Sequence, residues 1–178
     1  ADRVYQINLA IAGIAVGTVS LPVLSKAFKN KNLKKLSNIQ SKSFELSLLL
    51  SIPASLGLIL ASEEITNALF GYGSFSKEDV KLTADALKYF GYGVPAFALV
   101  KILSNFFFAR DNTKTPFYIS LGIVVINISI SVSLFSNFGF IIIPIATSIA
   151  TWLGVLVYIY LLNKKNSLLL KIELVPNL

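Results

Sequence analysis

The chain has 178 residues, of which 54% are hydrophobic and only 14% are charged, with a formal net charge of +7. Because soluble domains carry about 25% charged residues, this composition indicates an integral membrane protein. The sequence contains no Cys, His or Met, which excludes disulfides, thiolate chemistry, histidine acid–base catalysis and ordinary zinc sites. The chain opens on Ala1-Asp2-Arg3 without a basic n-region, so we expect a piece of a longer protein and no signal peptide here.

Five apolar stretches follow one another along the chain, each close to the roughly 20 residues that a membrane-crossing helix needs. Their apolar runs are continuous and do not alternate, which predicts helices and not the strands of a barrel. We therefore predict an all-α fold, a polytopic transmembrane bundle of five spanning helices. The predicted spans are 4–24, 44–61, 87–109, 117–135 and 140–162.

Lys and Arg concentrate in alternate loops, which predicts the orientation of the spans. The loop after the first span, the loop after the third span and the C-terminal end are expected on the cytoplasmic side. The first of these loops is the most basic, and its lysines are interpreted as determinants of topology that anionic lipids attract. They are Lys26, Lys29, Lys31, Lys34, Lys35 and Lys42. Because no aromatic residues are interleaved with them on a polar face, we expect no nucleic-acid partner.

Local signals indicate where individual helices begin and pack. Residues Ser76 to Asp79 form a capping box, so a helix is expected to begin there, outside the membrane, and to continue into the third span. Pro116 suits the first turn of the fourth span. Gly13 and Gly17 form a pair suited to close helix packing. The prolines inside spans, which predict kinks or carbonyls freed toward a cavity, are Pro53, Pro95 and Pro144.

Lys101 lies inside the third predicted span, which is otherwise built for lipid. A charged side chain at bilayer depth costs about 2.5–3.5 kcal/mol on insertion scales, so it indicates a polar cavity or a substrate path. Asn105, four residues on, lies on the same helix face. Arg3 and Gln6 share a face of the first span in the same way. Cations on the inward faces of two helices suit an anionic ligand such as a phosphate.

The residues alone leave a second interpretation of these cations open. Arg3 would then anchor its helix at the membrane interface, and Lys101 would pair with a carboxylate on a helix outside this chain. The span tyrosines and the single tryptophan, Tyr158 among them, are interpreted as interface belts and packing. No phosphate-binding glycine loop, catalytic carboxylate pair or nucleophile motif occurs in the sequence. We therefore expect transport and not catalysis, with no catalytic residue, metal ligand or cofactor.

Three ordered blocks of the sequence resemble a known family. The first begins A-D-R-V-Y-Q at Ala1 and runs to residue 25, and the second begins L-F-G-Y-G-S-F-S-K-E-D at Leu69. The third, F-F-A-R-D-N-T-K-T-P, covers residues 107–116. Together they are similar to the MurJ (MviN) lipid II flippases, with the first block matching the eighth helix of that family. The resemblance extends over nearly the whole chain, to about Asn163.

The resemblance implies the fold of the multidrug/oligosaccharidyl-lipid/polysaccharide exporters, which have two six-helix lobes around a central cavity. Residues 1–163 then correspond to helices 8–12, a partial C-terminal lobe, and residues 164–178 to a cytoplasmic basic tail or linker. The implied function is the movement of lipid II, a lipid-linked peptidoglycan precursor, from the inner to the outer leaflet by alternating access. Its implied location is the bacterial cytoplasmic (inner) membrane, with membrane lipids and the missing N-terminal lobe as partners.

In this family the cation of the A-D-R motif contacts the diphosphate of the substrate, which gives that role to Arg3. Lys101 falls where the family carries Lys or Arg in its tenth helix. Asp2, Gln6 and Asn105 complete the candidate substrate-binding set. Two alternatives stay open: a related exporter of another undecaprenyl-linked polysaccharide, and a membrane scaffold that transports nothing. A cation exporter would need buried carboxylates, for which this chain offers essentially Asp2.

Overall fold

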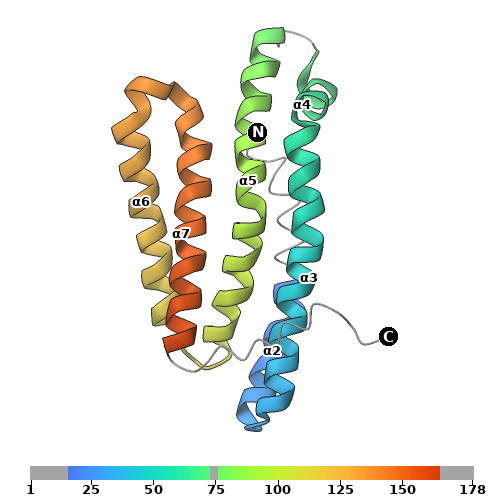
Figure 1. Ribbon diagram of the computed structural model, residues 1–178, viewed down its shortest axis with the longest axis vertical. Helices are drawn as coiled ribbons and strands as arrows, with labels where there is room; N and C mark the ends of the chain where they lie inside the picture. The colour runs from blue at the N-terminus through green and yellow to red at the C-terminus, as the bar shows by residue number, and fades with distance from the viewer. Residues whose placement is uncertain (1–15, 73–75, 165–178) are drawn as a thin grey trace.

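The computed structural model describes residues 16–72 and 76–164, and this part of the chain folds into helices without any strand (Figure 1). The prediction of an all-α bundle is therefore confirmed. In chain order the elements are α2 (Val16–Lys29), α3 (Leu33–Leu60), α4 (Ser62–Phe70), α5 (Lys77–Phe108), α6 (Lys114–Phe138), the 3-10 helix η2 (Gly139–Ile141) and α7 (Ile142–Lys164).

Three helical runs are long and apolar enough to cross a membrane: α3, α5 and the run from Lys114 to Lys164. The last run is α6, η2 and α7, and it folds back at η2, so that α6 and α7 lie side by side (Figure 1). With 25 and 23 residues, each of these two exceeds the roughly 20 residues of one crossing. The chain is thus a multi-pass membrane protein. Of the first predicted span, 4–24, only the part that α2 covers lies within the described residues.

The start of α3 and the presence of α4 differ from the sequence prediction. α3 begins at Leu33 and not near residue 44, because the Asn32 side chain accepts a 2.9 Å hydrogen bond from the Lys35 N–H and caps the helix. The short helix α4 occupies a segment that the sequence prediction treats as a loop. Its first turn carries Glu63 and Glu64, which favour a helix start.

The predicted start of α5 is confirmed. The Ser76 hydroxyl accepts a hydrogen bond from the Asp79 N–H at 3.1 Å, and the Asp79 carboxylate accepts one from the Ser76 N–H at 3.0 Å. Pro116 lies in the first turn of α6, as predicted. Pro144 lies in the first turn of α7, where it interrupts no helix interior. The kinks expected at the other two prolines stay predictions.

α5 is the central helix and packs against α3 on one side and α7 on the other (Figure 1). On the α3 side, the Ser55 hydroxyl donates a 2.7 Å hydrogen bond to the Gly91 carbonyl. On the α7 side, the Ser148 hydroxyl donates one of 2.8 Å to the Tyr89 carbonyl. Lipid is as apolar as leucine, so helices in a membrane are held by such hydrogen bonds and by close packing of small residues.

α6 packs on α7 and hardly touches α5. Its buried residues are Pro116 and Ile119, both near its first turns. The Asn127 amide nitrogen donates a 2.9 Å hydrogen bond to the Thr147 hydroxyl, which ties α6 to α7 deeper in the membrane. Because α5 and α6 both pack against α7 and make few contacts with each other, a groove remains between them.

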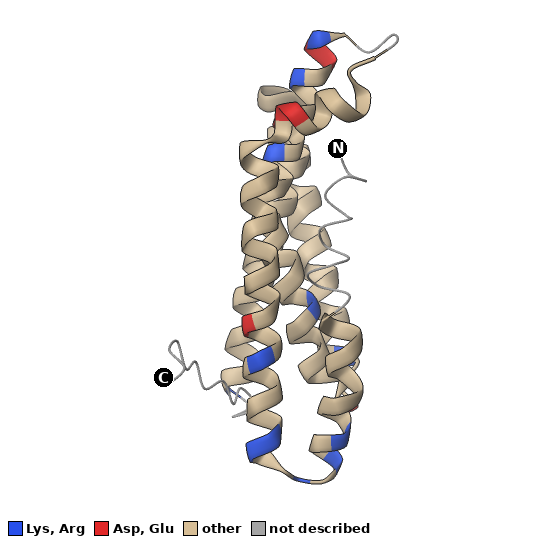
Figure 2. Ribbon diagram, turned by 90° about the vertical axis from the view of Figure 1, so that its right-hand side faces the viewer, with Lys and Arg blue, Asp and Glu red and all other residues tan. Residues whose placement is uncertain are grey.

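Charged residues gather at the two ends of the bundle (Figure 2). One end, formed by the α2–α3 turn, the α5–α6 connection and the last turn of α7, carries mainly Lys and Arg. The other end, at α4 and the start of α5, carries acids beside its lysines. This grouping is the one that the loop charges predict, and the expected cytoplasmic position of the basic end stays a prediction.

Candidate functional site

Lys101 and Asn105 lie on the face of α5 that meets α2. The Asn105 amide nitrogen donates a 2.8 Å hydrogen bond to the Gly17 carbonyl oxygen, and the Asn105 side chain is only 3% exposed. A Cβ atom at Gly17 would lie 3.1 Å from that nitrogen and 3.4 Å from Cγ of Lys101. The close packing predicted at Gly17 is confirmed, since a Cβ atom there would make a tight contact with the Asn105 side chain. Gly13 lies outside the described residues.

The Gly17 carbonyl also accepts a hydrogen bond of 3.3 Å from the Ser20 hydroxyl of its own helix. Asn105 therefore ties α5 to a fixed point of α2, and this contact accounts for its burial. Its role as a substrate contact stays a prediction. Arg3, Asp2 and Gln6, the other members of the candidate set, lie outside the described residues.

Acidic residues are sparse on the helices near Lys101. α2, α6 and α7 contain neither Asp nor Glu, and α5 contains none after Asp85, whereas α3, which packs on α2 and α5, carries Glu45. The Lys101 side chain is exposed in the bundle. A cation at this depth needs polar or anionic surroundings, and α2, α6 and α7 have no acidic residue to supply them.

The groove between α5 and α6 has a volume of about 580 Å³, and Lys101 forms part of its wall. That volume lies within the range of roughly 300–1,000 Å³ that is common for small-ligand sites. Most of the lining is apolar, with the rings of Phe97, Phe108 and Phe117 prominent. Tyr158 of α7 lies at its floor. The groove thus combines a lipid-like wall with one positive charge.

Three polar groups of the groove lie at the same depth. Lys101 lies seven residues before the end of α5, Tyr158 six before the end of α7, and Ser120 six after the start of α6. At about 1.5 Å per residue, each is about 9–11 Å from the basic end of the bundle. We call this set, Lys101, Ser120 and Tyr158, the polar level of the groove.

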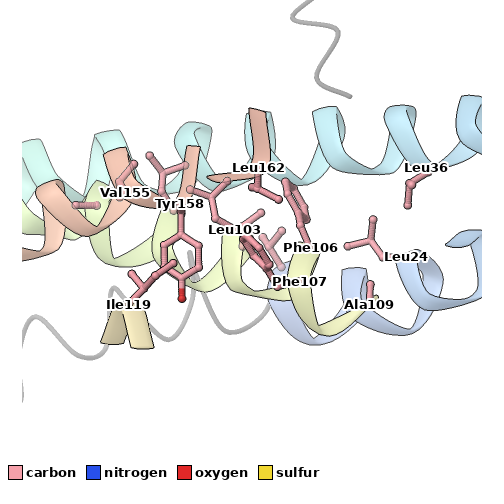
Figure 3. Packing of buried hydrophobic residues seen from close by; sticks show 14 of the residues in the cluster. Leu24, Leu36, Leu103, Phe106, Phe107, Ala109, Ile119, Val155, Tyr158 and Leu162 are labelled. Atoms are coloured by element: carbon pink, nitrogen blue, oxygen red, sulfur yellow. The ribbon is translucent and has the colours of Figure 1, made fainter. Parts of the chain in front are cut away.

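Tyr158 is fully buried, yet its hydroxyl makes no hydrogen bond within the described part of the chain. The Ser120 hydroxyl faces it without completing one. Figure 3 shows the ring passing Ile119, with its oxygen at the edge of the apolar cluster. A buried hydroxyl without a partner costs about 1–3 kcal/mol. Of the two roles that the sequence indicates for Tyr158, helix packing is confirmed and the interface belt is not, because periodicity does not reveal which tyrosine of a fully apolar helix points inward.

The segment after α5 forms an ordered connection at the basic end. The Arg110 guanidinium lies 5.7 Å from the ring centroid of Phe28 on α2. Partial burial lowers the pKa of Arg110, although a guanidinium stays charged in proteins. Asn112 accepts a 3.1 Å hydrogen bond from the Thr115 N–H and so caps the first turn of α6. Arg110 and Asn112, which belong to the third sequence block, thus help to hold the connection between α5 and α6 in place.

Comparison with known proteins gives a consistent result. A family model described as lipid II flippase MurJ matches residues 1–176. The probable lipid II flippase MurJ of Rickettsia prowazekii is 40% identical over 161 residues, which are 90% of this chain and 32% of that protein. Its counterpart in Rhizobium meliloti is 39% identical over 156 residues, 88% of this chain and 29% of that protein. The chain thus spans about a third of the length of these relatives.

A solved structure is also similar. It is described as lipid II flippase MurJ in an inward closed conformation, and it matches this chain with a TM-score of 0.83 at 27% sequence identity. The match covers 94% of this chain and 36% of that one. The helical arrangement described above is therefore one that a flippase of this description also has.

Proposed function

The chain belongs to the lipid II flippase MurJ family, and on that premise we propose that it is part of the C-terminal lobe of a flippase. The whole protein would move lipid-linked peptidoglycan precursor from the inner to the outer leaflet of the bacterial cytoplasmic membrane by alternating access. It would act as a transporter and not as an enzyme. Residues 1–163 would form the lobe fragment, residues 164–178 a basic cytoplasmic tail or linker, and the rest of the protein the N-terminal lobe.

The observation that supports this function most directly is the position of Lys101. It is an exposed cation at membrane depth, and α2, α6 and α7 carry no acid to neutralise it. A lysine in this setting attracts an anion, and the diphosphate of a lipid-linked precursor is one. In the proposal, Arg3, which lies outside the described residues, provides a second cation.

The Asn105–Gly17 hydrogen bond fixes the position of α2 relative to α5. Because Asn105 lies one turn from Lys101, any movement of α2 along α5 would have to break this bond or carry Lys101 with it. We infer that Asn105 holds α2 and α5 together while the lobe moves as a unit. Asp2 and Gln6 would complete the polar surface beside Arg3.

Rescue of cells depleted of their own flippase tests this function with the full-length protein. We expect the unaltered protein to rescue growth, Lys101→Arg to rescue it, and Lys101→Ala to rescue it poorly. Lys88→Ala, which removes an exposed lysine near the outer end of α5, serves as the matched control and should rescue fully. Failure of the unaltered protein would favour an exporter of another lipid-linked polysaccharide or a scaffold.

A further inference from the structure

Two groups of the polar level lack the partner that each would normally have: a carboxylate for the lysine and a hydrogen-bond acceptor for the tyrosine. Lys101 has no carboxylate on α2, α6 or α7, and the Tyr158 hydroxyl is buried without a hydrogen bond in the described part of the chain. Both line one groove of about 580 Å³ and lie at one depth. An anionic oxygen between them would accept a hydrogen bond from each.

The charge of the groove decides which anion fits. Among its lining residues, Lys101 is the single charged one, so one negative charge neutralises it. A phosphodiester carries one negative charge. A diphosphate carries at least two negative charges and would need a second cation, a role that the proposed function assigns to Arg3. The hydroxyls of Tyr158 and Ser120 can donate hydrogen bonds to an anion but add no charge.

The walls indicate what the anion is attached to. Phe97 lies deeper in the membrane than Lys101, and Thr113 and Phe117 lie at the basic end, so the groove runs from the cytoplasmic surface inward past the polar level. Its lining is mostly apolar, as a hydrocarbon chain requires. The side of the membrane that it opens to is the cytoplasmic leaflet, which carries anionic lipids.

We propose that this groove binds one anionic glycerophospholipid of the cytoplasmic leaflet. Its phosphodiester lies at the polar level, where Lys101 and the hydroxyls of Tyr158 and Ser120 donate hydrogen bonds to it. One acyl chain follows the aromatic wall toward Phe97. The lipid phosphate is the counter-ion of Lys101 when no cargo is bound, so lipid and cargo exclude each other at this residue.

Binding of a spin-labelled phosphatidylglycerol to the delipidated full-length protein tests the proposal, with spin-labelled phosphatidylcholine as the zwitterionic comparison. Tyr158→Phe removes only the hydroxyl, and we expect it to weaken phosphatidylglycerol binding about tenfold. Tyr160→Phe, an exposed neighbour on the same helix, is the matched control and should bind normally. Unchanged binding by Tyr158→Phe, or equal binding of both lipids to the unaltered protein, would overturn the proposal.

Photo-cross-linking identifies the occupant directly. A benzophenone amino acid in place of Phe117 lies in the groove, and one in place of Phe135, exposed near the far end of the same helix, does not. We expect position 117 to capture a phospholipid and position 135 to capture none selectively. Capture of a polyprenyl diphosphate, or of a peptide from elsewhere in the protein, would overturn the proposal.

These variants distinguish failure of the lipid site from failure of the proposed flippase function. Reduced phosphatidylglycerol binding with normal transport in Tyr158→Phe supports the lipid site whatever the cargo is. Normal lipid binding in that variant, with transport lost in Lys101→Ala, overturns the lipid site and leaves the proposed function standing.

Discussion

The amide nitrogen of Asn105 lies 2.8 Å from the carbonyl oxygen of Gly17, which is 88 positions away in the sequence. This contact joins the helix that follows the A-D-R motif to the helix that carries Lys101. It is possible because Gly17 has no side chain to keep α5 at a distance. The relative position of α2 and α5 thus depends on one glycine and one amide.

Replacing Asn105 with Ala should lower the stability of the full-length protein by about 0.6–2 kcal/mol, the range measured for hydrogen bonds between membrane helices. Thermal unfolding in detergent measures the effect. Ser129→Ala, which removes an exposed hydroxyl bonded only to its own helix, should change stability little. An equal loss in both variants would show that the contact between α2 and α5 contributes nothing specific.

Gly91 and Gly57 form a matched pair for testing the packing of α3 on α5. A Cβ atom at Gly91 would lie 2.9 Å from Cγ1 of Ile59 and 3.3 Å from Cβ of Leu58, whereas nothing lies within 4 Å of one at Gly57. Gly91→Leu should therefore destabilise the bundle by about 1–3 kcal/mol through overpacking. Gly57→Leu should not, and the same unfolding measurement compares them. A smaller effect at Gly91 than at Gly57 would contradict the packing described.

Asn127 and Thr147 should be energetically coupled across α6 and α7. The Thr147 hydroxyl accepts the Asn127 amide hydrogen and donates to the Ile143 carbonyl at 2.7 Å, so each side chain depends on the other for its place. A double-mutant cycle with Asn127→Ala and Thr147→Ala should give a coupling energy of about 0.6 kcal/mol, and at most about 1.7. Strict additivity of the two losses would contradict the contact.

The orientation of the bundle is open to a direct test, because the sequence contains no cysteine. Single cysteines in place of Asn30 and Asn112, both at the basic end, should react with an impermeant thiol reagent only from the cytoplasmic side. A cysteine in place of Tyr72, beside α4 at the other end, should react from outside. The reverse labelling pattern would show that the bundle has the opposite orientation in the membrane.

Composition and periodicity were sufficient to predict the class of fold, the order of the helices and the start of α5. Each of these depends on local features: the length of an apolar run, or a Ser and an Asp three residues apart. The early start of α3 was missed because its first turns are basic and polar, so hydropathy alone does not mark them. α4 was missed because a helix of 9 residues is too short to produce a span signal.

The site was predictable in part. Lys101 is conspicuous in the sequence because a charge inside an apolar span is costly. Tyr158 and Ser120 are not conspicuous, since tyrosine and serine are ordinary residues of membrane helices. They become significant only because α5 and α6 both pack on α7 and leave a groove, and that arrangement depends on contacts between residues far apart in the chain.

In the proposed function, the cargo binds through the positive charge of Lys101. Transport of a fluorescent lipid-linked precursor by the full-length protein in proteoliposomes measures this most directly. We expect Lys101→Ala and Lys101→Gln to transport at least tenfold more slowly than the unaltered protein, and Lys101→Arg and Lys88→Ala to transport at nearly its rate. Full transport by Lys101→Gln, which keeps a polar side chain one atom shorter but not the charge, would show that the cargo does not use the charge of Lys101.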